Sequence, residues 1–194
     1  MIKALDKSRP GSISDHSTSV EQGVRWEIPM RGWMILNTDG AAKGNVGPAG
    51  AGEVIRNDKG EWVIGFSEYL GHCSALTAEL KALIRGLKVA RELGVQKLGI
   101  RVDSSVLVGM LTDQRNEHPK YHFLIQQCKQ LLCEEDWEVD ITHCFRETNQ
   151  VADKLANIGT TGRLGVTMYQ TMPMEIQAIL YADSMGFLWP RHSS

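Results

Sequence analysis

A chain of 194 residues is long enough for one well-packed domain with tails, and too short for two ordinary domains to be expected. Hydrophobic residues make up 42% of it and charged residues 23%, an ordinary globular composition that excludes disorder along the whole length. The 21 Lys and Arg against 23 Asp and Glu give a formal charge of -2, which excludes a generally basic surface for a polyanion. Any attraction to nucleic acid must therefore be local.

The cysteines and the apolar segments indicate an intracellular protein. Cys73, Cys128, Cys133 and Cys144 lack the paired spacing of a zinc site and are too few for a disulfide scaffold. Residues 1–20 have no continuous apolar core, and no apolar run reaches the roughly 18 residues that a membrane span needs. We therefore expect no membrane partner, and the sequence does not distinguish the nucleus from the cytoplasm.

The first third of the chain is expected to form a leader and three strands. Residues 1–30 mix Ser, Pro, Gly and charges, which predicts a flexible leader or linker. The run 33–39 is apolar and ends at Asp-Gly, which is typical of a buried central strand. A glycine-rich connection, 44–52, then leads to two strands over 52–56 and 61–69 that are joined by a tight hairpin.

The remaining elements alternate helices and strands. They are a helix 74–93, a strand 97–103, a short helix 104–111, a helix from Pro119 to about Cys133, a strand 137–145 and a helix 149–158 with Asn149 as its N-cap. This order predicts an α/β domain over 31–160, with a five-stranded mixed sheet in which an antiparallel three-strand meander precedes parallel strands, flanked by helices.

Residues 161–194 are expected to be a C-terminal extension that packs on the domain, with a short helix around 174–182. Its apolar residues are interpreted as cover for the core rather than as a binding stripe: Met172, Met174, Ile176, Ile179 and Leu180. A protein partner that binds the N- or C-terminal extension stays open as the alternative. The domain itself is expected to be a monomer.

Four acidic residues stand where a metal site could form. Asp39 and Asp103 each end a predicted strand, although either could instead serve a turn or cap a helix. Glu79 falls inside the apolar stripe of its helix, where a carboxylate is costly unless something satisfies it; the alternative is a Glu that reaches solvent from the end of the stripe. Asp153 lies among small residues of the last helix. Carboxylate clusters at the carboxyl ends of strands suit Mg²⁺ or Mn²⁺, and two such ions can support phosphodiester hydrolysis.

The segments around these acids resemble the ribonuclease H family, specifically the domains attached to reverse transcriptases of plant non-LTR retroelements and their stand-alone relatives. The matching segments, in the family's order, are Leu36-Asn-Thr-Asp-Gly-Ala41, Thr77-Ala-Glu-Leu-Lys-Ala-Leu83, Val102-Asp-Ser104 and Arg146-Glu-Thr-Asn-Gln-Val-Ala-Asp153. The resemblance covers about residues 33–159. It implies an endonuclease that hydrolyses the RNA strand of RNA–DNA hybrids, with Asp39, Glu79, Asp103 and Asp153 as catalytic ligands of two Mg²⁺ ions, or of Mn²⁺ in their place.

The resemblance also implies residues that contact the substrate: Gly40, Asn45, Ser74 and Ser104. Many members of the family carry a catalytic-loop His before the last acid, but here the corresponding loop holds Arg146, as in relatives with the R-E-x-N pattern. We favour Arg146 over the nearby His143 as the charged group beside the scissile phosphate.

Two departures from the family suggest a weak grip on the substrate. The segment between Leu111 and Tyr121 has only Arg115 and Lys120 as cations, whereas some relatives carry a basic protrusion there. Ala75 and Leu76 replace polar groups that touch the DNA strand in some relatives. A domesticated, inactive domain that binds nucleic acid or protein is therefore the main alternative. Another nuclease of the same superfamily, such as an integrase, would use the same kind of metal site, but the order of the strands favours ribonuclease H itself.

Overall fold

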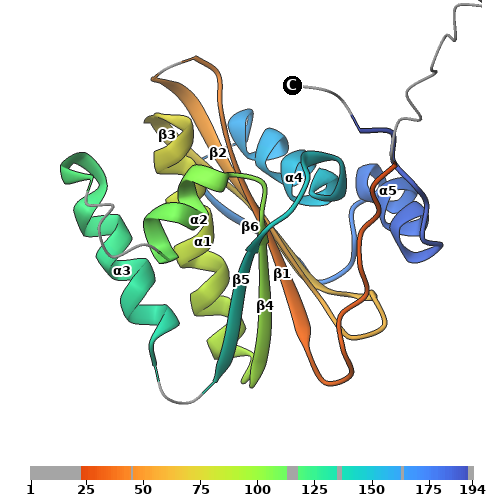
Figure 1. Cartoon of the computed structure of the whole chain (residues 1–194). Helices are drawn as coiled ribbons and strands as arrows, with labels where there is room; N and C mark the ends of the chain where they lie inside the picture. Colours follow the sequence, from red (N-terminus) through yellow and green to blue (C-terminus); the bar gives the residue numbers. More distant parts are fainter. Residues whose placement is uncertain (1–22, 45, 113–117, 135–136, 163, 192–194) are drawn as a thin grey trace, which may run out of the picture.

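The computed structural model describes residues 23–191 apart from 45, 113–117, 135–136 and 163. A single sheet crosses the molecule, with α1, α2 and α3 on one face and α4 and α5 on the other (Figure 1). The strands are β1 Met34–Ala42, β2 Gly47–Arg56, β3 Trp62–Cys73, β4 Lys97–Val102, β5 Glu138–His143 and β6 Gly165–Tyr169. The helices are α1 Ala75–Glu92, α2 Ser105–Thr112, α3 His122–Leu132, α4 Gln150–Thr160 and α5 Met174–Ser184, with 3-10 turns η1 Pro119–Tyr121 and η2 Arg146–Thr148.

The sheet has the order β5-β4-β1-β2-β3-β6. Strands β1, β2 and β3 form an antiparallel meander, and β4 and β5 add in parallel beside β1. This confirms the predicted mixed sheet, but the predicted number of five strands is wrong. The sixth strand, β6, pairs antiparallel with residues 65–68 of β3. Its residues are mostly exposed, so it lacks the hydrophobic alternation by which a half-buried strand is recognised.

Residues 47–52 of the glycine-rich segment are strand and not connection, because β2 begins at Gly47. The glycines of β2 serve close packing, because a Cβ atom on Gly52 would lie 2.1 Å from the backbone nitrogen of Ala156, and one on Gly50 would lie 2.3 Å from its carbonyl oxygen. Helix α4 therefore rests directly on the backbone of β2. The interpretation as a connection was wrong because glycine in a strand marks a close approach of another backbone as readily as a turn.

Each face of the sheet carries its own hydrophobic core. The larger core lies under α1, α2 and α3 and includes Leu36, Leu83 and Ile100. The smaller one joins β2, α4 and α5 through Val54, Val151, Leu155, Ile176 and Leu180. In the C-terminal extension, Ile176 and Leu180 are thus core cover as expected. Met172 and Met174, by contrast, are 38% and 81% exposed, so the interpretation as core cover is wrong for these two residues.

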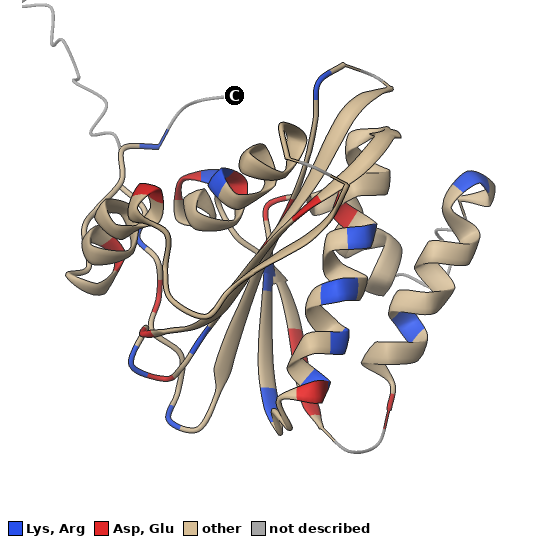
Figure 2. Ribbon diagram, turned by 180° about the vertical axis from the view of Figure 1, so that it is seen from behind, with Lys and Arg blue, Asp and Glu red and all other residues tan. Residues whose placement is uncertain are grey.

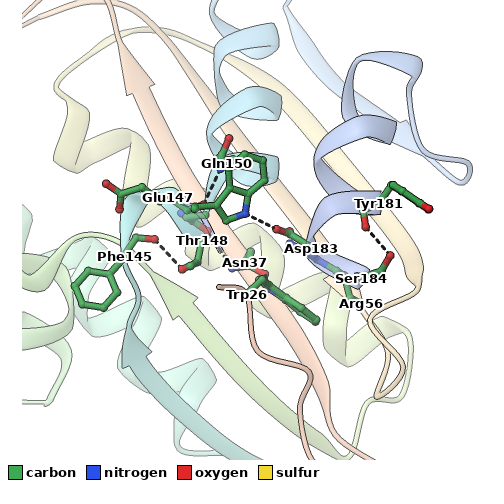
Figure 3. A network of polar contacts seen from close by, with 12 residues as sticks. Trp26, Asn37, Arg56, Phe145, Glu147, Thr148, Gln150, Tyr181, Asp183 and Ser184 are labelled. Carbon is green, nitrogen blue, oxygen red and sulfur yellow. Dashed lines mark hydrogen bonds and ion pairs between the residues drawn. The ribbon is translucent and has the colours of Figure 1, made fainter. Parts of the chain in front are cut away.

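A buried amide network fixes the start of α4 against the centre of the sheet (Figure 3). The side chain of Asn37 accepts a hydrogen bond from Trp26 Nε1 at 3.0 Å and donates to Asn149 Oδ1 at 3.0 Å. Asn149 in turn donates to the carbonyl of Thr38 at 3.0 Å. Asn149 is the N-cap residue of α4, but its side chain makes no capping bond. The side chain of Asn149 therefore positions the start of α4 by its hydrogen bonds to β1 and not by capping the helix.

A buried ion pair holds α5 against β2. Arg56 Nη1 lies 2.8 Å from Asp183 Oδ2, and both side chains are almost fully buried. The Trp26 ring covers the guanidinium at 4.1 Å, and Trp189 Nε1 donates to the second oxygen of Asp183 at 3.1 Å. The backbones of Val24 and Trp189 exchange two hydrogen bonds. The segments at both ends of the described chain are thereby tied to the domain.

Lys and Arg residues follow one another along α1 (Figure 2). They are Lys81, Arg85, Lys88 and Arg91. Arg85 pairs with Glu68 and Arg91 with Glu134, so acidic neighbours offset half of this row. Among the described residues, no helix is both long and apolar enough to cross a membrane.

Glu53 is buried within β2, and both of its carboxylate oxygens lack a hydrogen-bond partner. Burial raises the pKa of Glu53 well above its ordinary value of 4.5, the charge of Arg85 opposes the rise and that of Glu68 adds to it. The folded protein therefore favours the neutral form of this carboxyl more strongly than the unfolded chain does. The contribution of this group to stability is largest below the unfolded pKa and is lost as pH rises toward the folded one.

We expect Glu53→Gln to raise the melting temperature more at about pH 8 than at about pH 4, because the amide removes this ionisation. Thermal unfolding followed by circular dichroism at the two pH values measures the difference between variant and wild type. An equal shift at both pH values would show that ionisation of Glu53 does not limit stability.

Candidate active site

Two neighbouring parallel strands bring the first two acids side by side. Parallel pairing between β1 and β4 ends at Thr38 opposite Val102. Asp39 follows Thr38 within β1, and Asp103 follows Val102 directly after the end of β4. Strand β1 does not stop at Asp39 as predicted, because residues 39–42 continue in antiparallel pairing with β2. Asp39 therefore sits within a strand, at the position where its parallel neighbour turns away.

Helix α1 brings Glu79 against this pair through a contact that requires glycine. A Cβ atom on Gly40 would lie 2.1 Å from the backbone nitrogen of Glu79, so the helix backbone packs directly on β1. The amide of Gly40 also donates to Asp39 Oδ1 at 2.8 Å. Gly40, which the resemblance implied as a substrate contact, thus has a structural role that sets the separation of Asp39 and Glu79.

The fourth acid comes from the first turn of α4, which the Asn37–Asn149 contact positions. Asp153 Oδ1 lies 3.4 Å from Arg146 Nη2, and the side chain of Arg146 is 78% exposed. This pair is worth little in stability, because an exposed ion pair is screened by solvent. It does hold a guanidinium over the same cleft as the acids.

The four acids influence one another electrostatically. Burial raises the pKa of Asp39 to about 8, with further upward contributions from Asp103, Asp153 and Glu79 that the hydrogen bond from Gly40 opposes. Burial also raises the pKa of Glu79 and that of Asp103. Carboxylates that crowd together and lose water resist ionisation unless a cation joins them. A bound cation would therefore favour the ionised form of these carboxylates.

All four acids line one cleft of about 540 Å³ together with Arg146. Among the described residues, no group of three or more His, Cys, Asp or Glu side chains is already arranged to hold one metal ion. The donor set nevertheless fits a hard divalent cation. Glu79 Oε2 is buried without a hydrogen-bond partner, and the available donors are carboxylate oxygens, which Mg²⁺ and Mn²⁺ prefer.

The two candidates for the basic group both lie near Asp103. Arg146 and His143 each lower its pKa through their charge, Arg146 more strongly. Arg146 additionally pairs with Asp153 and lines the cleft of the four acids, whereas His143, the last residue of β5, does not line that cleft.

The other residues implied as substrate contacts have internal partners. Ser104 accepts a hydrogen bond from Leu107 N at 3.3 Å and bonds to the carboxylate of Glu79. Ser74 is the N-cap of α1, accepting from Thr77 N at 3.4 Å. Asn45, Arg115 and the rest of 113–117 lie outside the described residues.

Sequence reasoning missed a second set of side chains beside the acids. A cleft of about 910 Å³ adjoins the first and shares Asp103, Arg146 and Asp153 with it. The rings of Phe145, Phe187 and Trp189 form part of its remaining wall, beside His143, Glu147, Gln150, Pro190 and Arg191. No local pattern marks the Trp189-Pro190-Arg191 stretch, because its approach to Phe145 depends on long-range packing.

The fold and the cleft together define a protein of the ribonuclease H class. A family model described as reverse transcriptase-like matches residues 37–159, which contain all four acids. The chain belongs to this ribonuclease H-like family.

Relatives and solved structures agree with this assignment. A protein of Arabidopsis thaliana named as a ribonuclease H is 41% identical over 173 residues, which are 89% of this chain and 28% of that protein. Ribonuclease HI of Halobacterium salinarum is 35% identical over 121 residues, 61% of this chain and 60% of that protein. The chain thus spans less than two thirds of the length of either relative.

The solved structures confirm the fold. The crystal structure of RNase H1 from Halobacterium salinarum matches with a TM-score of 0.60 and 31% identity, covering 66% of this chain and 96% of that one. LC11-RNase H1, isolated from compost and solved in complex with an RNA/DNA hybrid, matches with a TM-score of 0.60 and 30% identity over the same shares of the two chains.

Proposed function

We propose that this chain is an endonuclease that hydrolyses the RNA strand of RNA–DNA hybrids with two divalent metal ions. The observation that carries the proposal is the convergence of four acids, from β1, α1, the end of β4 and α4, on one cleft. A structural role does not account for Glu79 Oε2, which is buried without a partner. A cation between the carboxylates offsets both the buried charge and the mutual repulsion.

Asp39, Glu79, Asp103 and Asp153 would hold the metal ions, Mg²⁺ or Mn²⁺. When bound, two such ions activate a water and stabilise the leaving oxygen of a phosphodiester. Around them, Gly40 and the α1 backbone keep Asp39 and Glu79 at a fixed separation, and Ser104 orients the Glu79 carboxylate. Arg146 would contact the scissile phosphate, to which its guanidinium offers two parallel N–H donors.

The hybrid is proposed as substrate because LC11-RNase H1, with the same fold, is solved with an RNA/DNA hybrid. Hybrid duplexes are recognised through the shape of a wide minor groove and its 2′-hydroxyls. Cleavage with little sequence preference is therefore expected.

The test is a cleavage panel with the purified wild-type chain in Mg²⁺ and in Mn²⁺. We expect internal cleavage of labelled RNA in a hybrid, and none of the same RNA as a single strand or in an RNA duplex. Addition of EDTA should stop the reaction. No metal-dependent product from the hybrid would contradict the enzyme and favour a module that only binds nucleic acid, for which the same hybrid serves as a binding probe.

A further inference from the structure

Four side chains form a surface beside the acids that we call the aromatic shelf: Phe145, Phe187, Trp189 and Arg191. Phe145 lies just before η2, while the other three come from the segment after α5. Phe187 is 51% exposed and Phe145 is 40% exposed. These exposed rings line the cleft of about 910 Å³. They therefore need a different account from the buried apolar residues of the core.

The shelf is ordered by contacts among its own members. The rings of Phe187 and Trp189 meet edge to face with centroids 4.8 Å apart. The guanidinium of Arg191 lies over the Phe145 ring, 4.6 Å from its centroid. Trp189 is anchored from below through Asp183 and the backbone of Val24. A rigid aromatic surface loses little conformational freedom when a ligand binds.

The shelf is continuous with the active site. Its cleft includes Asp103, Arg146 and Asp153, which also line the cleft of the four acids. Two cations line it, Arg146 and Arg191, together with Glu147 and the amide of Gln150. A strand whose phosphate lies at the acids can therefore continue over the shelf.

Exposed rings interleaved with arginines are the arrangement that binds unpaired nucleotides, because bases stack on the rings while the cations follow the phosphates. Bases inside a hybrid duplex are already stacked on each other and cannot use such rings. Resting on the proposed function, we propose that the aromatic shelf binds a single-stranded continuation of the RNA strand held at the acids. The preferred substrate is then a hybrid with an unpaired RNA extension. The shelf residues after α5 lie beyond residues 37–159 of the family match.

The proposal is tested by binding, separately from cleavage. Fluorescence anisotropy in an Asp103→Asn background with Mg²⁺ compares a blunt hybrid with the same hybrid carrying an unpaired RNA extension at its 5′ or 3′ end. We expect one extension to tighten binding by about tenfold, the contribution of a base stacked on an aromatic ring.

Phe187→Ala should abolish this gain without changing the salt dependence of binding. Arg191→Ala should also weaken the gain and lower the salt slope by about one ion. Phe123→Ala, which removes a ring that is 77% exposed on α3, should leave the gain intact.

Equal affinity for blunt and extended hybrids would overturn the proposal, as would a gain that survives Phe187→Ala or one that Phe123→Ala removes equally. Cleavage of the blunt hybrid by the otherwise wild-type chain is scored in parallel. Tighter binding of the extended hybrid without cleavage would contradict the proposed nuclease activity and support the aromatic shelf as a binding surface. Cleavage with equal binding of both hybrids would support the nuclease activity and contradict the proposed role of the shelf.

Discussion

Replacement of Asp183 with Ala is expected to lower the free energy of unfolding by about 3–5 kcal/mol, because it leaves Arg56 buried without its counterion. The side chains of the pair are only 1% and 3% exposed. Two other nitrogens of Arg56, Nε and Nη2, already lack hydrogen-bond partners. Burial lowers the pKa of Arg56 and the charge of Asp183 raises it, so the carboxylate offsets part of the cost of burying the guanidinium.

Urea unfolding followed by circular dichroism measures the loss. The matched control is Asp140→Ala, which breaks the exposed ion pair with Arg101 and should cost at most about 1 kcal/mol. A double variant, Arg56→Met with Asp183→Leu, should recover most of the stability, because it removes both charges at once. Similar losses for Asp183→Ala and Asp140→Ala would contradict the assigned role of the buried pair.

The parts of the fold that the sequence predicted best are those with strong periodicity. The helix expected over 74–93 is observed as α1. Its prediction succeeded because the apolar stripe and Gly94 after it are signals within the segment itself. Strand β2 was predicted too short because its glycines serve α4, which lies about a hundred residues later. Strand β6 was missed because an exposed edge strand carries no alternation of apolar residues.

The residues of the candidate site also fall into those that a local pattern predicts and those that depend on long-range packing. Short motifs marked the acids, and Glu79 also had a physical argument from its place in the apolar stripe. The structure brings all four to one cleft. The role of Asn149, by contrast, depends on Asn37, 112 positions away. The aromatic shelf likewise depends on the packing of the chain end beside η2, which no local pattern encodes.

The largest effect on function is expected from Asp103→Asn. The change keeps the size of the side chain and removes one charge from a site that would hold cations. Metal ions at such sites contribute several kcal/mol of transition-state stabilisation, so the loss of one ligand should slow hydrolysis by about a thousandfold. The fold should persist, since the charge of Asp103 is one of those that make ionisation of Asp39 difficult. The matched control is Asp140→Asn, an exposed residue of β5.

The most direct test is therefore the initial rate of RNA cleavage in a labelled hybrid with Mg²⁺, measured for the wild type, Asp103→Asn and Asp140→Asn after circular dichroism has verified that all three are folded. The proposed two-metal site predicts cleavage at similar rates by the wild type and Asp140→Asn, and a loss of about a thousandfold for Asp103→Asn. Equal rates for the wild type and Asp103→Asn, or no hybrid cleavage by the folded wild type, would contradict it.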